Sequence, residues 1–209
     1  MKGAGVQVAC YIFGAGSFYG LSQRPAPGDT VIAADGGWEP CRGVGLTPDL
    51  LLGDFDSLHT VPDFARIRRV PVEKDDTDMM AAIKKGLSLG CNAFYLYGAT
   101  GGRFDHTMAN VQALTFLAKR GARGFLFGRD TVCTVVQDGF CDLPARSGGY
   151  VSVFCLSDCA RGVDISGLKY EIQNAGLTNA FPLGVSNEFK GENARVSVQS
   201  GTLLIIAPR

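Results

Sequence analysis

Short apolar runs separated by longer mixed segments mark the first 130 residues of the chain. The runs are rich in aliphatic, β-branched and aromatic residues and are bounded by glycine, proline or aspartate, which is typical of buried β-strands. We expect six strands in this part, over residues 6–13, 30–35, 49–54, 68–72, 93–99 and 124–128.

Two of the segments between these runs have the periodicity of helices. In residues 77–89 one helical face carries Met80, Ile83 and Leu87, and Asp75 and Asp76 precede it as candidate N-caps. In residues 105–120 the apolar face carries Met108, Val111, Leu114 and Ala118, and Gly121 ends the helix. Strands that alternate with helices predict an α/β fold with a mainly parallel sheet, which binds ligands at the carboxyl ends of its strands.

The pattern changes after about residue 130. Short β-type runs separated by Gly, Ser, Asp and Asn follow one another without a long helical segment, and they predict an all-β antiparallel sandwich. These runs cover residues 132–137, 150–156, 167–172, 193–199 and 201–207. We therefore expect two domains, an α/β domain over residues 1–132 and a β-sandwich over residues 133–209.

Composition narrows the class of protein. Hydrophobic residues make up 46% of the 209 residues and charged ones 19%, with 20 Lys and Arg against 20 Asp and Glu. This balance argues against disorder and against the basic surface of a nucleic-acid-binding protein. It favours a globular protein that binds small molecules or other proteins.

The apolar runs and the cysteines bear on location. The runs are far shorter than the roughly 20 residues of a membrane-spanning helix, and Met1-Lys2-Gly3 leads into a run interrupted by Gln7, unlike a signal peptide. Seven cysteines scattered through apolar segments favour buried thiols in a reducing compartment. Cys155 and Cys159 lack a matching second pair, which argues against zinc. We expect a cytoplasmic protein without a membrane partner.

Three acidic segments each follow a predicted strand. ADGG (34–37), GDFDS (53–57) and EKDDTD (73–78) would reach the same edge of the sheet. If the second segment is extended, Asp54 and Asp56 point to the same side, because side-chain direction repeats every two residues. Each segment alone suits a turn with solvated carboxylates, whereas their convergence indicates a site.

Carboxylates gathered at one edge need a positive partner, because two of them about 4 Å apart repel by roughly 4 kcal/mol at an effective dielectric near 20. A hard divalent cation removes this repulsion, and oxygen ligands favour Mg²⁺ over zinc. Asp75 and Asp78 could share a helical face at such a site, although acids at a helix start also act as caps. Lys74 beside them could hold a phosphate oxygen.

A second polar cluster lies in GATGGRFDHTMANVQ, residues 98–112, where a predicted strand passes through glycines into a helix. Such helix N-termini offer unpaired N–H groups to phosphates. Arg103, His106 and Asn110 fall at i, i+3 and i+7 and could grip a nucleotide, although His106 alone suits a structural role equally well. Residues 14–16 predict a tight turn near this site.

ADGG, GDFDS, KDDTD, GGRFDH followed by MAN, and SNEF in the β-rich tail occur in this order over nearly the full chain. In this order the motifs resemble those of the thiamine pyrophosphokinase family. The resemblance implies a Rossmann-like catalytic domain that binds ATP and Mg²⁺, a thiamine-binding β-sandwich, and a homodimer with active sites between one subunit's α/β domain and the other's sandwich. It also implies the reaction, in which ATP gives its terminal pyrophosphate to the hydroxyl group of thiamine and AMP is released.

The same resemblance assigns roles to residues. Mg²⁺ would be held by Asp54, Asp56 and Asp78, and the expected catalytic set adds Asp35 and Asp75 near the reacting phosphates. ATP would contact Lys74, Thr77, Arg103, His106 and Asn110. Thiamine would be received by Ser186 and Asn187, which on composition alone would form a β-turn.

Several points stay open at this stage. The proton acceptor is Asp35 or Asp75, and the aromatic residue that stacks on thiamine is undecided between Tyr170 and Phe181, since Trp38 lies beside ADGG. The acidic site does not read the acceptor, so a Mg²⁺-dependent pyrophosphokinase acting on another hydroxymethyl heterocycle, such as a pterin, is an alternative. A non-catalytic sensor of nucleotide or thiamine diphosphate is another.

Overall fold

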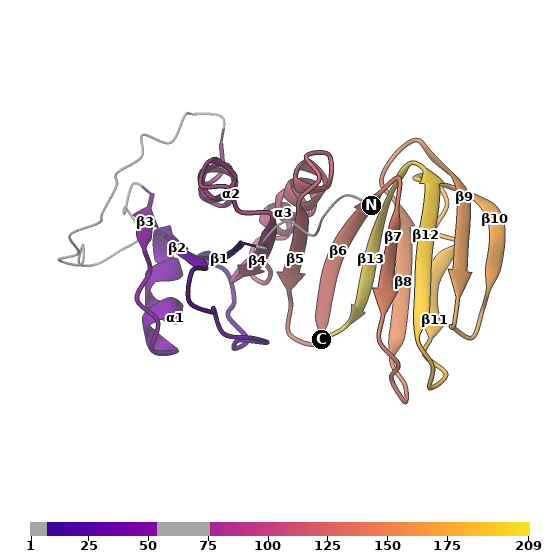
Figure 1. Ribbon diagram of the computed structural model, residues 1–209, viewed down its shortest axis with the longest axis horizontal. Coiled ribbons are helices and arrows are strands. Elements are labelled where there is room, and N and C mark those ends of the chain that lie inside the picture. Colours follow the sequence, from indigo (N-terminus) through magenta and orange to yellow (C-terminus); the bar gives the residue numbers. More distant parts are fainter. Residues whose placement is uncertain (1–7, 54–75) are drawn as a thin grey trace. The chain divides into compact units, whose positions relative to one another are not determined.

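The computed structural model of the protein describes residues 8–53 and 76–209 (Figure 1). The chain divides into two compact units, Met1–Arg129 and Asp130–Arg209. The boundary expected from the sequence, at residues 132 and 133, falls inside strand β6. The strand predicted over residues 68–72 lies outside the described residues, as do Asp54, Asp56, Lys74 and Asp75.

The described part of the first unit contains a parallel sheet with the strand order β5-β4-β1-β2-β3. The strands are β1 (Ala9–Phe13), β2 (Thr30–Ala34), β3 (Leu50–Leu52), β4 (Ala93–Tyr97) and β5 (Arg123–Phe127). Their continuous apolar sequences fit strands covered on both faces, and all residues of β1 are buried. The prediction of a mainly parallel α/β domain is confirmed.

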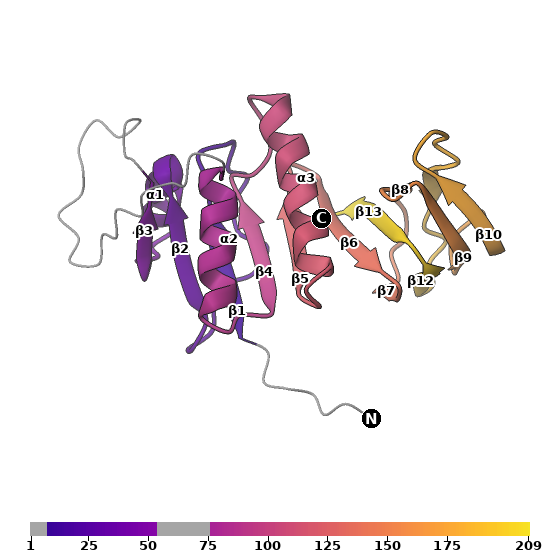
Figure 2. The same ribbon diagram turned by 90° about the horizontal axis from the view of Figure 1, so that it is seen from above.

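The helices of the first unit cover both faces of this sheet. They are the short η1 (Asp35–Gly37) and α1 (Trp38–Gly43), followed by α2 (Asp78–Ser88) and α3 (Phe104–Ala118). Figures 1 and 2 show α2 and α3 together on one face, and Figure 1 shows α1 on the other. From β1 the chain adds β2 and β3 on one side and β4 and β5 on the other, so the strand order reverses between β1 and β4.

Both long helices are rotated from the orientation that the sequence predicted. The buried face of α2 is formed by Met79, Ala82, Ile83 and Gly86, and that of α3 by Asn110, Ala113, Leu114 and Leu117. Met80 and Leu87 are only partly buried, and Met108 is 49% exposed. In α2 a glycine explains the shift, because a Cβ on Gly86 would lie 2.9 Å from Cys10 Sγ and the helix therefore packs closely on the sheet there.

The start of α2 also differs from the prediction. Thr77, rather than Asp75 or Asp76, is the N-cap, and its hydroxyl accepts a hydrogen bond from the Met80 N–H over 3.2 Å. The carboxylate of Asp76 instead binds Lys84, eight residues further along the chain, with 2.6 Å between Oδ2 and Nζ. The N-cap therefore lies one residue after the two aspartates that the sequence suggested.

The second unit is a sandwich of two antiparallel sheets, as predicted. One has the order β11-β8-β13-β6 and the other β10-β9-β12-β7. The strands are β6 (Thr131–Gln137), β7 (Phe140–Leu143), β8 (Tyr150–Cys155), β9 (Cys159–Ser166), β10 (Ile172–Thr178), β11 (Gly184–Glu188), β12 (Ala194–Ser200) and β13 (Thr202–Pro208). Inward-facing side chains of both sheets form one core, with Val151, Val163, Val196, Leu203 and Ile205 fully buried.

One predicted strand of this unit was wrong. Residues 167–171 lie outside the strands, with only an isolated bridge between Leu168 and Phe189, and β10 begins at Ile172. Gly167 has a φ of +74° and packs on the Asn193 carbonyl, so this segment turns instead of extending.

Two further features concern the whole chain. Within the described ranges, no helix has the length and apolar character that crossing a membrane requires. All seven cysteines are described, and each is a free thiol.

Candidate active site

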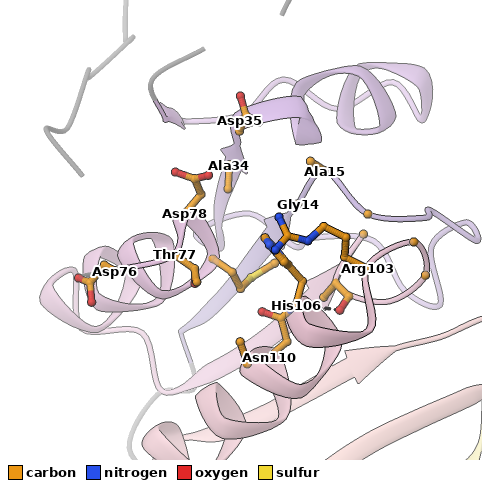
Figure 3. A pocket seen from close by; sticks show the side chains of 17 residues that line it. Gly14, Ala15, Ala34, Asp35, Asp76, Thr77, Asp78, Arg103, His106 and Asn110 are labelled. Atoms are coloured by element: carbon orange, nitrogen blue, oxygen red, sulfur yellow. Dashed lines mark hydrogen bonds between the residues drawn. The ribbon is translucent and has the colours of Figure 1, made fainter. Parts of the chain in front are cut away.

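A pocket of about 460 Å³ opens in the first unit where β1, β2 and β4 end and α2 and α3 begin (Figure 3). This is the point at which the strand order reverses, where α/β sheets generally bind ligands. Six residues predicted for the site line it, namely Asp35, Thr77, Asp78, Arg103, His106 and Asn110. These residues are far apart in the sequence and meet at this edge of the sheet, where the sequence motifs were expected to converge.

The floor of the pocket is built from the loops that follow β1 and β4. The N–H groups of Gly14, Gly16 and Ser17 donate to the carbonyls of Tyr97, Gly98 and Thr100, each over 2.8 Å. A Cβ on Gly14 or Gly16 would lie 2.8 or 2.6 Å from the Gly98 carbonyl oxygen, so this approach requires glycine. Residues 14–16 therefore lie at the site, as predicted.

Three aspartates line the pocket (Figure 3), and of these Asp76 is paired with Lys84, whereas Asp35 and Asp78 lie on one side. Asp35 follows β2 and has a φ of 48°, a left-handed conformation that aspartate tolerates better than most residues. Asp78 is the first residue of α2. Gly53, which directly precedes the acidic pair of the sequence, packs on Asp35, because a Cβ there would lie 3.2 Å from the Asp35 Cα.

The opposite side of the pocket carries cationic and imidazole side chains (Figure 3). Arg103 is the N-cap residue of α3, and its guanidinium binds both carboxylate oxygens of Asp105, Nε to Oδ1 over 3.1 Å and Nη2 to Oδ2 over 2.5 Å. This hydrogen bonding raises the pKa of Arg103 and lowers the pKa of Asp105. His106 follows on the first turn of the helix, and its backbone N–H donates to Asp105 over 3.0 Å.

Asn110 lies on a different face of α3 from the one expected. The sequence placed it on a polar stripe with Arg103 and His106, but its side chain is 7% exposed and belongs to the buried face of the helix. Its Nδ2 donates to the Ala99 carbonyl over 2.7 Å. The residue lines the pocket from below while it holds the loop after β4 (Figure 3).

A cation at the acidic side has suitable oxygen donors in Asp35 and Asp78. Within the part of the chain that the structure describes, no three His, Cys, Asp or Glu side chains gather closely enough to hold a metal ion. The other predicted ligands, Asp54 and Asp56, lie outside that part. The two carboxylates fit a hard cation that has phosphate oxygens and water as its remaining ligands.

The two residues predicted to receive thiamine lie on β11 in the second unit. Ser186 is exposed with a φ of 61°, and its N–H donates to Ser152 Oγ over 3.1 Å. Asn187 is buried, its Oδ1 accepting from the Tyr170 N–H over 2.9 Å and its Nδ2 donating to the Tyr170 carbonyl over 2.7 Å. Asn187 thus holds the segment that carries Tyr170.

The aromatic candidates differ in accessibility. Tyr170 and Phe181 are 59% and 66% exposed, and both can present a ring face to a ligand. Trp38 is half-buried under the guanidinium of Arg42, 5.6 Å from its ring centroid, and does not line the pocket.

Sequence reasoning missed some apolar lining of the pocket. Met79 and Ala109 border it beside Asp78 and His106. Apolar side chains have no functional group that would mark them in the sequence as part of a site. Ala109 could have been found only from its position three residues after His106 on the same helix.

Comparisons with known proteins match the two compact units of the chain to two different family models. A family model described as "Thiamin pyrophosphokinase, catalytic domain" matches residues 26–126, and one described as "Thiamin pyrophosphokinase, vitamin B1 binding domain" matches residues 141–203. A curated thiamine pyrophosphokinase of Bacillus subtilis (strain 168) is 27% identical over 183 residues, which cover 84% of this chain and 85% of that protein.

Solved structures show the same fold. The thiamin pyrophosphokinase of Geobacillus thermodenitrificans matches with a TM-score of 0.84 and 27% identity, over 97% of this chain and 98% of that one. The Bacillus subtilis structure matches with a TM-score of 0.86 and 24% identity, over 97% and 99% of the two chains.

Proposed function

Because the chain belongs to the thiamine pyrophosphokinase family, we propose that it transfers pyrophosphate from ATP to the hydroxyl group of thiamine. The products are thiamine diphosphate and AMP. The observation that carries the proposal is the pocket at the strand-order reversal, with carboxylates on one side and Arg103 and His106 on the other. It lies within the unit that the catalytic family model matches.

The transfer requires attack by the thiamine hydroxyl oxygen on the β-phosphorus of ATP. The new O–P bond forms as the bond from the β-phosphorus to the oxygen bridging the α-phosphorus breaks, and AMP leaves with that electron pair. The hydroxyl proton passes to a carboxylate, for which we propose Asp35 or Asp75. Asp35 suits this role because it lines the pocket and its turn is held by close packing of Gly37 on β1.

The basic side of the pocket suits the phosphates. Asp105 holds Arg103 beside the pocket through Nε and Nη2, which leaves the N–H groups of Nη1 and the second N–H of Nη2 to donate to phosphate oxygens. The hydroxyl of Thr77 caps α2 as an acceptor and keeps its hydrogen for a phosphate oxygen. We propose that Lys74 and His106 complete the groups that contact ATP, and that Asn110, predicted with them, belongs to the same phosphate site.

We propose Mg²⁺ as the metal, held by Asp78 with Asp54 and Asp56. When bound, it would neutralise charge on the phosphate oxygens during transfer. The oxygen donors of Asp35 and Asp78 and the position of Gly53 against Asp35 support this assignment.

We further propose that thiamine is received by Ser186 and Asn187 and that two chains form a homodimer with active sites at the subunit interface. The exposed hydroxyl of Ser186 and the exposed rings of Tyr170 and Phe181 suit a heteroaromatic substrate. A cytoplasmic location is supported by the seven free thiols, which are stable in a reducing compartment.

An assay of AMP release tests the proposal. The purified protein is incubated with ATP, Mg²⁺ and either thiamine or a panel of hydroxymethyl heterocycles that includes a pterin, and AMP and the diphosphate product are measured. We expect AMP and thiamine diphosphate in equal amounts, only with thiamine. A preference for a pterin would identify another pyrophosphokinase, and tight nucleotide binding without AMP would identify a sensor.

A further inference from the structure

The four successive carbonyl groups of residues 97–100 are all fixed by hydrogen bonds. Three of them accept from backbone N–H groups of residues 14–17, over 2.8 Å in each case. The fourth, that of Ala99, accepts from the side chain of Asn110 over 2.7 Å. Three of these four carbonyls are therefore held by the loop after β1, and the fourth is held by Asn110 of α3.

The backbone on both sides of Ala99 contains three glycines in left-handed conformations. Gly98, Gly101 and Gly102 have φ values of +60°, +81° and +70°, which glycine reaches without steric cost. The peptide between Ala99 and Thr100 is trans, so its carbonyl and its N–H point in opposite directions. Rotation of this peptide would exchange the two groups relative to the pocket that Ala99 lines.

The direction of this peptide matters for an anionic ligand. A carbonyl oxygen turned into the pocket would face phosphate oxygens and repel them, whereas an N–H group attracts them. The Asn110 amide is buried and cannot exchange its bond readily for one with solvent. It therefore favours the orientation in which the Ala99 oxygen points toward α3.

We propose that Asn110 is a positioning residue, which holds the Ala99–Thr100 peptide so that the loop before Arg103 accepts the phosphates of ATP. The inference rests on the proposed function, because it takes a nucleoside triphosphate as the ligand. It changes the role predicted for Asn110, which acts through the loop and does not read the nucleotide base.

Two substitutions separate this role from others. Asn110→Ala removes the donor at every pH. Asn110→Asp removes it when the carboxylate is ionised and restores it when the acid is protonated, since a carboxylic acid can donate to the Ala99 carbonyl. Burial beside a carbonyl raises the pKa of such an acid, so the donor returns as the pH falls from about 9 to about 6.

Binding of the α,β-methylene analogue of ATP with Mg²⁺, measured by calorimetry, is the main readout because it needs no turnover. We expect Asn110→Ala to weaken it roughly threefold to tenfold at all pH values, with thiamine binding unchanged. For Asn110→Asp, the affinity relative to the unmodified protein should recover as the pH falls. The corresponding GTP analogue should lose as much affinity as the ATP analogue in both variants.

Three results would overturn the proposal. A relative affinity of Asn110→Asp that does not change with pH would mean that the donor is unimportant. A larger loss for the ATP than for the GTP analogue would mean that Asn110 reads the base. Lower thermal stability with unchanged nucleotide affinity would mean a purely structural residue.

The matched control is Gln112→Glu, which likewise replaces an amide by an acid of the same length, two residues along α3 on its exposed side, and should leave nucleotide affinity unchanged. If Asn110→Ala does not fold, Asn110→Ser replaces it with a small polar side chain. The proposed function is tested separately, because it would be contradicted if the unmodified protein formed no AMP. The binding comparison does not depend on that result, because it requires no turnover.

Discussion

At the scale of single residues, the position of Asp78 gives the most direct test of the chemistry. It is the first residue of α2 and shares one side of the pocket with Asp35 (Figure 3). Replacing it by asparagine keeps the size and removes the charge that a cation and its phosphates would require. We expect Asp78→Asn to lower kcat for AMP formation by about a hundredfold or more, with the melting temperature nearly unchanged.

The control for this change is Asp158→Asn, which neutralises an exposed carboxylate of the second unit. It should leave kcat unaltered. Near-normal Mg²⁺-dependent turnover by Asp78→Asn would remove Asp78 from the metal site.

The sequence alone could place a residue in the site where that residue follows the end of a strand or lies at the start of a helix. Asp35, Asp78 and Arg103 follow this rule, because polar residues after an apolar run lie at the carboxyl edge of the sheet. Asn110 does not follow it. Its direction depends on how α3 is rotated on the sheet, and that rotation is set by the contacts of Leu114 and Leu117 with Gly124 on β5.

At the scale of elements, the close contact between η1 and β1 determines where Asp35 lies. A Cβ on Gly37 would lie only 1.8 Å from the Phe13 carbonyl oxygen, so η1 would have to move. We expect Gly37→Ala to destabilise the protein by about 1–3 kcal/mol, as overpacking does, and to lower kcat by displacing Asp35. Chemical denaturation and AMP formation measure the two effects.

Gly43→Ala is the matched control, because Gly43 ends α1 and an added Cβ there would meet no atom within 4 Å. Alanine there should be neutral or stabilise by up to about 1 kcal/mol, since it favours helix more than glycine does. Equal stability and activity of the two variants would show that the contact of η1 with β1 does not hold Asp35.

Long apolar strands and the two long helices were predictable because their patterns extend over many residues, whereas η1, α1, β7, β9, β10 and β11 were missed. In α1 the sequence WEPCRG is short and contains Pro40, which is tolerated only because the first turn of a helix needs no N–H donors there. In β11 the sequence GVSNE has little apolar character, and its pairing with β8 supplies the order that its own pattern lacks.

At the scale of the whole molecule, the proposed homodimer with shared active sites predicts complementation between two inactive chains. One chain carries Asp78→Asn in its first unit. The other carries Ser186→Trp, which places a large ring where thiamine is expected, at an exposed position of β11. Neither chain alone should form thiamine diphosphate at an appreciable rate.

A mixed dimer would contain one site with both halves unmodified and one with both halves altered. After the two chains are unfolded and refolded together in equal amounts, half of the dimers are mixed, so about a quarter of all sites should be active. The mixture should therefore recover about a quarter of the unmodified activity, and light scattering should give twice the mass of one chain. Activity no higher than that of the two parents would place each complete site within a single chain, because only a site shared between subunits can be rebuilt by exchange.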